Sequence, residues 1–168
     1  MIVIVCFVNC TNRDNSKQWD EARIDPQIVQ DSVYQNTSNV IYLIEQKKDS
    51  TENQHLRLNN CRAYYLNSNI LFINIGTWNG SNGQGIVINF LDRKFYTETY
   101  FDSDLIIEGL KESKQKIVFQ KLTLDKPEYN LGDSLYGKME FKSIEISNKG
   151  DSIIHYGKGS FRTKVTKT

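Results

Sequence analysis

The pattern of apolar and polar positions changes at Val40. Before this residue, Thr11 to Asn39 are mostly polar and follow no regular period. After it, short apolar or alternating runs are separated by turn residues, a spacing typical of antiparallel strands. The pattern therefore predicts one all-β domain over residues 39–168. We expect an antiparallel β-sandwich or a lipocalin-like, partly closed barrel, with at most one or two short helices.

Within this domain the strands are predicted from alternation and from enrichment in β-branched and aromatic residues. Leu56 and Leu58 alternate with polar neighbours and are separated from the next run by Asn59-Asn60. Residues 104–114 fit a helical turn or a short strand equally well. The remaining predicted strands cover residues 40–45, 61–66, 70–75, 86–91, 95–101, 117–124, 134–146 and 152–165.

Glycines interrupt the two C-terminal strands. Gly157 and Gly159 are in phase with Phe161, and Gly137 leaves a gap in the preceding strand. Glycine inside a strand indicates tight curvature, a bulge or a close backbone approach. We therefore expect a side chain at Gly157 or Gly159 to collide with the opposite wall or to demand a disfavoured backbone.

The N-terminus begins with an apolar run, residues 2–8, that stops at Asn9-Cys10. The run meets the lower length of a secretory h-region, although no Lys or Arg precedes it. We interpret this as a chain that starts late, so that Met1 is not the true start. A buried first strand is the alternative, because Ile and Val favour strands equally well.

Phe7-Val8-Asn9-Cys10 resembles a bacterial lipobox, with Asn9 where Gly, Ala or Ser is usual. Looser lipoboxes of this kind occur in Bacteroidota. The C-terminal hairpin also resembles those of small uncharacterised lipoproteins of that group, through residues 132–137, Gly150 and residues 157–161. The resemblance implies lipid on Cys10 and a cell-envelope location, anchored and facing the periplasm. The chain would be cytoplasmic if the apolar run is a strand.

In this interpretation residues 1–9 are a signal-peptide remnant and residues 10–38 a polar tether. Trp19 to Tyr34 is the one part of the tether with helical promise, and Pro26 interrupts it. The chain has three cysteines, an odd number for an oxidising compartment. Removal of Cys6 and lipid on Cys10 would leave Cys61, which we expect to be a small buried hydrophobe.

Composition narrows the choice of partners. The chain has 21 basic and 20 acidic residues, whereas a phosphate-binding domain normally has a basic excess, so we expect no nucleic acid. No apolar run approaches the ~20 residues of a spanning helix, so the expected contact with a membrane is the lipid anchor only. Cysteine and histidine spacings give no reason to expect a metal or a cofactor.

The candidate binding residues are Trp78, Asn79, Ser81 and Asn82, in a loop rich in amides and glycine. A tryptophan beside such a loop could stack on an apolar ring while the amides bind hydroxyls, as for sugars or peptides. The alternative is a surface loop whose Trp covers the open end of the core. His155 is in phase with Gly157, so we interpret it as a structural hydrogen-bonding residue.

These observations favour a non-enzymatic, lipid-anchored envelope protein that binds a small ligand or another protein. An inhibitor or immunity-type protein, which blocks a toxin or an envelope enzyme, is the main alternative. A small hydrolase is the second alternative, and would require carboxylates such as Asp92, Glu98 and Asp133 to converge.

Overall fold

The fold is known from a computed structural model, and the described part of the chain is all β. It contains ten strands and no helix, which confirms the predicted all-β class. The described residues are 17–28, 33–46, 54–66, 69–78, 82–103, 114–146 and 151–167. The strands are β1 (Asp20–Glu21), β2 (Arg23–Ile24), β3 (Thr37–Gln46), β4 (Gln54–Tyr65), β5 (Leu71–Trp78), β6 (Asn82–Leu91), β7 (Lys94–Ser103), β8 (Lys114–Leu124), β9 (Ser134–Ile146) and β10 (Ser152–Lys167).

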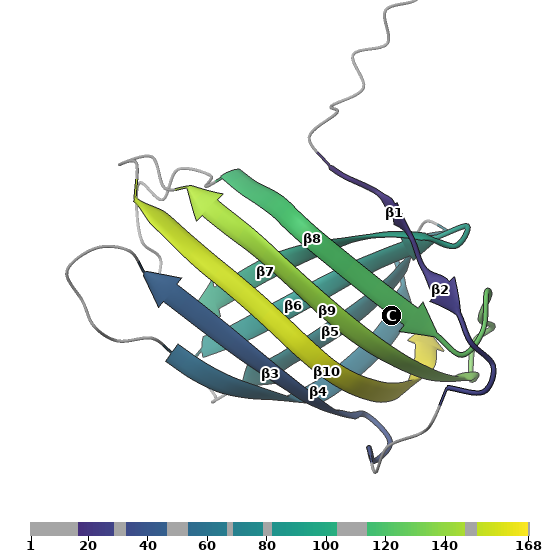
Figure 1. Ribbon diagram of the computed structural model, residues 1–168. Helices are drawn as coiled ribbons and strands as arrows, with labels where there is room; N and C mark the ends of the chain where they lie inside the picture. The colour runs from purple at the N-terminus through teal and green to yellow at the C-terminus, as the bar shows by residue number, and fades with distance from the viewer. Residues whose placement is uncertain are drawn as a thin grey trace, which may run out of the picture.

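All ten strands belong to one mostly antiparallel sheet (Figure 1). Its order is β1-β7-β6-β5-β4-β3-β10-β9-β8-β2, and β4 also pairs with β10. The pairings of β2 with β8 and of β4 with β10 are parallel. The predicted hairpin of the last two long strands is confirmed, with thirteen residue pairs between β9 and β10.

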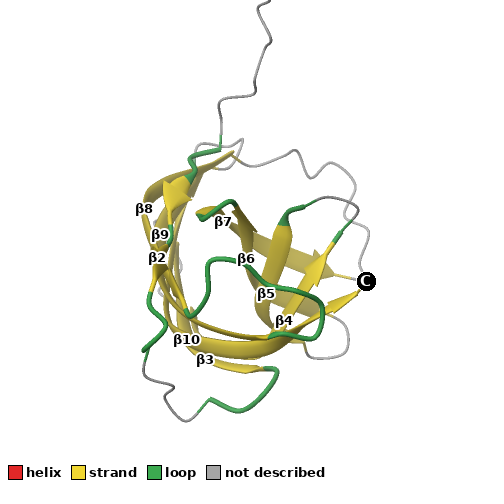
Figure 2. Cartoon of the chain, turned by 90° about the vertical axis from the view of Figure 1, so that its right-hand side faces the viewer, coloured by secondary structure: helices red, strands yellow, loops and turns green. Residues whose placement is uncertain are grey.

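The sheet curls, so that β8, β9, β10 and β3 form one wall and β5, β6 and β7 the other (Figure 2). Strand β4 belongs to both walls. Its first half pairs with β3, and its second half pairs with β5 and β10. The core-facing side chains change phase between Leu58 and Cys61, which are both buried. Asn59-Asn60 therefore marks a bend within one strand, and not the gap between strands that the sequence indicates.

The space between the walls is filled by side chains. Ile73 and Ile75 of β5 and Ile86 and Ile88 of β6 are fully buried on one wall. Phe141 of β9 and Phe161 of β10 are fully buried on the other. Burial of apolar area contributes about 25 cal/mol per Å², so this cluster is the main source of stability. It leaves the outer faces of both walls for other contacts.

The curl brings the edges of β7 and β8 together, but no backbone ladder joins them, so the sheet is not closed into a barrel. Two glutamine side chains of β8 span the gap instead. Gln120 Oε1 accepts a hydrogen bond from the Thr97 N–H at 2.9 Å, and Gln115 Oε1 accepts one from the Thr99 N–H at 3.2 Å. These contacts satisfy edge N–H groups that would otherwise be unpaired.

A short N-terminal strap, residues 17–25, lies across the same gap. Its β1 pairs with the start of β7 and its β2 pairs with the end of β8. Ala22, between them, is buried, and its N–H donates to the Arg93 carbonyl at 2.8 Å. The stretch predicted as tether, residues 10–38, thus contributes the first two residues of β3 and two short strands of its own. They are too short to be recognised by alternation and depend on edges that only the folded sheet provides.

Close packing explains the glycines of β10. A β-carbon on Gly157 would lie 2.5 Å from Phe141 Cε1 and 2.9 Å from Ile86 Cδ1 of the opposite wall. Gly159 has a φ of 156°, and a β-carbon there would lie 2.6 Å from the Val40 Cα. Both positions therefore exclude larger residues, as the sequence predicts: Gly157 by packing, and Gly159 by its backbone.

We expect Gly157→Val and Gly159→Val each to lower the free energy of unfolding by about 1–3 kcal/mol, because the first overpacks the core and the second strains the backbone. Denaturant midpoints would measure the loss. Lys158→Val is the matched control, since Lys158 lies between the two glycines and is exposed. It should change stability by no more than about 0.5 kcal/mol. A gain in stability at both glycines would contradict the packing described here.

Candidate functional site

The outer face of the β4–β7 wall carries an aromatic and amide-rich surface. On the other side of the same strands the residues that face the core are mostly aliphatic, so alternation turns the polar residues outward. Cross-strand register places Arg62 opposite Asn74 and Tyr64 opposite Phe72. Gly76 pairs with Gly85 of β6, and the two glycines leave the middle of this face without side chains. The absence of side chains at these two positions leaves a hollow in the surface.

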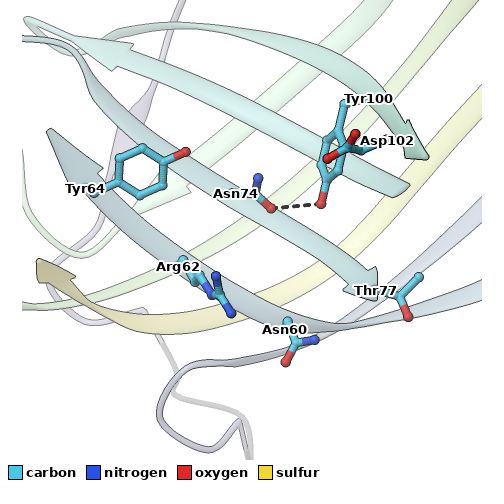
Figure 3. Close-up of a pocket in the computed structure, with 7 residues that line it drawn as sticks. All are labelled: Asn60, Arg62, Tyr64, Asn74, Thr77, Tyr100 and Asp102. Atoms are coloured by element: carbon cyan, nitrogen blue, oxygen red, sulfur yellow. Dashed lines mark hydrogen bonds between the residues drawn. The ribbon is translucent and has the colours of Figure 1, made fainter. Parts of the chain in front are cut away.

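The hollow is a pocket of about 430 Å³ that opens to solvent (Figure 3). Strand β4 supplies three lining side chains, β5 two and β7 two. The mixture of rings, amides and opposite charges provides stacking surfaces beside hydrogen-bond donors and acceptors. The lining residues are Asn60, Arg62, Tyr64, Asn74, Thr77, Tyr100 and Asp102.

Tyr100 forms the wall of the pocket on the β7 side. A β-carbon on Gly76 would collide with the Tyr100 hydroxyl, so glycine is required for the ring to lie there. The hydroxyl donates a hydrogen bond to Asn74 Oδ1 at 3.0 Å (Figure 3). Burial raises the pKa of Tyr100, so that it remains a neutral donor. These two side chains are thereby held in fixed positions.

The β4 side of the pocket carries polar groups that are open to a ligand. Within the described part of the chain, Asn60 and Arg62 form no side-chain hydrogen bond or ion pair. The ring of Tyr64 is stacked beside that of Phe72, with centroids 6.0 Å apart and planes at 9°. The pocket thus combines a held aromatic surface with a free amide and a free guanidinium.

A second pocket, of about 640 Å³, continues across β4 toward the C-terminal end of β10. It shares Asn60, Arg62 and Tyr64 with the first pocket, so these three side chains form a ridge between two hollows. The second pocket adds Asn36, Cys61, Ala63, Thr163, Lys164 and Thr166. Because the two hollows share Asn60, Arg62 and Tyr64, they adjoin each other at β4.

The N-terminal strap covers the far part of the same wall. Lys17 Nζ lies 2.9 Å from Glu98 Oε1 and donates to the Tyr96 hydroxyl at 3.0 Å. Trp19 packs edge-on against Tyr96, with centroids 4.5 Å apart. Tyr96 and Glu98 are therefore already engaged by the chain itself, and neither lines the two hollows.

Of the predicted binding residues, the structure describes two. Trp78 ends β5 and Asn82 begins β6, while Asn79 and Ser81 lie outside the described residues. Trp78 pairs with Gly83, which in turn pairs with Asp102 of the pocket. Thr77 precedes Trp78 and lines the pocket. Cys10, the predicted lipid site, also lies outside the described residues.

The sequence did not reveal the pocket residues of β4 and β7. Arg62 and Tyr64 belong to a run predicted as a strand, and nothing in the sequence distinguishes the outer face of that strand as a binding surface. Their proximity to Tyr100 depends on the pairing of β4 with β5, of β5 with β6 and of β6 with β7. The available signal was the alternation of polar and aromatic residues with buried ones in each strand.

The carboxylates of the hydrolase alternative lie in three different places. Asp92 is in the β6–β7 turn, where Asp92 and Arg93 both have positive φ. Glu98 pairs with Lys17, and Asp133 lies 3.4 Å from Lys126. Among the described residues, no group of three or more His, Cys, Asp or Glu side chains could hold a metal ion.

His155 forms a buried network at one end of the core. Its Nδ1 lies 2.8 Å from the Tyr42 hydroxyl and its Nε2 lies 2.9 Å from Glu145 Oε2. A ring whose Nε2–H donates to the carboxylate leaves Nδ1 to accept a hydrogen bond from the Tyr42 hydroxyl. The network links β3, β9 and β10. Burial and the nearby Glu145 charge raise the pKa of Tyr42.

Comparison with known proteins adds no relative: no family model, no curated protein and no solved structure matches the chain. Among the described residues there is also no helix of the length and apolarity that a membrane span requires. The pocket must therefore be interpreted from its own chemistry.

We expect Tyr42→Phe to lower the free energy of unfolding by about 1–3 kcal/mol near neutral pH, because His155 Nδ1 loses its buried partner. The folded state keeps Tyr42 protonated while the unfolded chain ionises near pH ~10. Wild-type stability should therefore fall as the pH rises above that value, and that of Tyr42→Phe should fall less steeply. Denaturant unfolding at several pH values measures both effects. Tyr34→Phe, at an exposed tyrosine, should change neither.

Proposed function

We propose that this protein is a non-enzymatic, lipid-anchored binding module of the cell envelope, with its ligand on the outer face of β4, β5 and β7. The observation that supports it most is the pocket beside Arg62, where fixed aromatic rings lie next to unpaired polar groups. The carboxylates at Glu98 and Asp133 each have their own lysine partner, so we do not include hydrolysis in the proposal.

The ligand class that fits this pocket best is a saccharide. A sugar ring presents an apolar C–H face, which an aromatic ring such as Tyr64 can cover, and a rim of hydroxyls. The amide of Asn60, the guanidinium of Arg62 and the carboxylate of Asp102 offer both donors and acceptors for that rim. The two connected hollows favour several linked sugar units.

In this proposal the curled sheet has the shape of a lipocalin-like, partly closed barrel, but the ligand does not bind inside it. A lipocalin-like site would lie inside the walls, where Ile75, Ile86 and Phe141 are fully buried against the core. That filled interior supports a rigid scaffold whose binding surface is external. The predicted loop that begins after Trp78 would then border the ligand rather than cover an internal cavity.

An inhibitor or immunity-type protein is the second candidate. Tyrosine and arginine are the residues that most often dominate protein interfaces, and Arg62, Tyr64 and Tyr100 lie together on this face. Affinity purification from envelope extracts with wild type and with Tyr64→Ala distinguishes the two. A stoichiometric protein partner that Tyr64→Ala loses would favour the inhibitor.

For the saccharide, we expect binding on a glycan array and a dissociation constant raised about tenfold or more by Asn60→Ala or Tyr64→Ala, since each removes a ligand contact worth about 1–2 kcal/mol. Titration calorimetry with the oligosaccharide found on the array measures the change. Phe101→Ala is the control, because Phe101 is exposed on β7 but does not line the pocket. A blank array, or equal affinity in all variants, would reject the saccharide.

The anchor rests on the sequence around Cys10. We expect wild type made in a bacterial host with the lipoprotein pathway to fractionate with membranes and to carry acyl chains on Cys10, detectable by mass spectrometry. Cys10→Ser should move to the soluble fraction of the envelope, while Cys61→Ser, at a buried cysteine, should stay with membranes. An unmodified Cys10 in wild type would contradict the anchor.

A further inference from the structure

A strongly basic surface covers the outer face of β8, β9 and β10, three of the four strands of the other wall. Alternation turns seven basic side chains outward on these strands, apart from Lys164 of the second hollow, but only one carboxylate, Glu140, although the whole chain has a net charge of +1. The charge balance of the sequence thus conceals a separation of charge in space. The basic residues are Lys114, Lys116, Lys121, Lys138, Lys142, Lys158 and Arg162.

Apolar side chains are exposed among these charges. Val118, at the bulge of β8, is 51% exposed, and Ile146, at the end of β9, is 46% exposed. Ile41 of the adjoining β3 is 52% exposed and pairs with Lys158. Exposed aliphatic residues beside flexible lysines are typical of surfaces that enter the headgroup region of a membrane.

Three of the lysines surround a shallow pocket of about 300 Å³ on this face. Lys121, Lys138 and Lys158 contribute from β8, β9 and β10, so the pocket spans all three strands. Glu140 also lines it, and accepts a hydrogen bond from the Tyr156 hydroxyl at 3.0 Å. Three ammonium groups around one carboxylate leave net positive charge for an anionic headgroup.

The geometry points to this face as a docking surface for an anionic lipid bilayer, which we propose fixes the orientation of the domain on the membrane. Binding requires no lipid on Cys10 and is separate from the saccharide pocket, which lies on the opposite wall. Docked in this way, the domain would present the ridge of Arg62 and Tyr64 away from the bilayer.

A nucleic acid is the competing anionic partner, and the aromatic residues of the face argue against it. Single strands bind by stacking bases on free rings. Here Phe119 packs edge-to-face against Tyr156, with centroids 6.5 Å apart and planes at 67°. The Tyr156 hydroxyl is held by Glu140, and Lys121 lies over the Phe119 ring. The rings are thus engaged, while the aliphatic residues are exposed.

The test uses the full chain with Cys10→Ser, so that no lipid can be attached. Co-sedimentation compares vesicles of mixed phosphatidylglycerol and phosphatidylcholine with vesicles of phosphatidylcholine alone. We expect binding to the mixed vesicles only, weakened by added salt. Lys116→Gln with Lys142→Gln should weaken it at least ~10-fold, since each lysine near an anionic surface contributes about 1 kcal/mol. The control, Arg93→Gln with Lys94→Gln, removes equal charge elsewhere and should have little effect.

Val118→Ser distinguishes the partners. A bilayer contact predicts several-fold weaker vesicle binding, because the exposed apolar side chain is lost. Equal binding of the protein to both vesicle types would overturn the proposal. So would an equal loss of binding in the Lys116/Lys142 variant and in the Arg93/Lys94 control. Tighter binding to a single-stranded oligonucleotide that Val118→Ser leaves unchanged would assign the face to nucleic acid instead. None of these results depends on whether Cys10 is acylated or on whether the pocket binds sugars.

Discussion

The fold depends on satisfying two sheet edges that approach each other without pairing. The β7 edge presents the N–H groups of Thr97 and Thr99, and unpaired backbone groups are costly when water is excluded. Gln120 and Gln115 accept from them, and the other ends of their amides are also bonded, to the Gln18 carbonyl and to Ser143. Side chains thus replace a ladder, which lets the sheet curl around a full core.

Most of the strand pattern is predictable from the sequence, because each wall buries one face and alternation reports that directly. The long strands β9 and β10 follow the predicted 134–146 and 152–165 closely. The departures have local causes. Asn59-Asn60 resembles a break because two polar residues occur where the core-facing phase changes. Residues 82–85 resemble a loop because two of them are glycines, yet residues 83–85 pair with the end of β5 and Asn82 pairs with Ser103 of β7. Residues 104–113 lie outside the described residues.

The candidate site was less accessible to sequence reasoning than the fold. The loop after Trp78 is predicted as a binding site because its amides and glycines are contiguous in the chain. The pocket instead combines Arg62, Asn74 and Tyr100, which are brought together by register across four strands. The basic face is not predictable from composition for a related reason, because the net charge of +1 is a sum over both walls. Properties that depend on which side of a strand a residue occupies appear only once the pairing is known.

The strap has a mechanical consequence. In an anchored chain, a pull on the tether would reach the domain first at Lys17 and Trp19 and then at Asp20–Ile24, which is held by the two-residue strands β1 and β2. These short pairings carry the load before the long ladder of β9 and β10 does, so they should yield first. Their loss would expose the gap that Gln115 and Gln120 span and would remove Ala22 from the edge of the core, while the β9–β10 ladder stays paired. In such an anchored chain the strap would be a weak link between the motion of the membrane and the rest of the sheet.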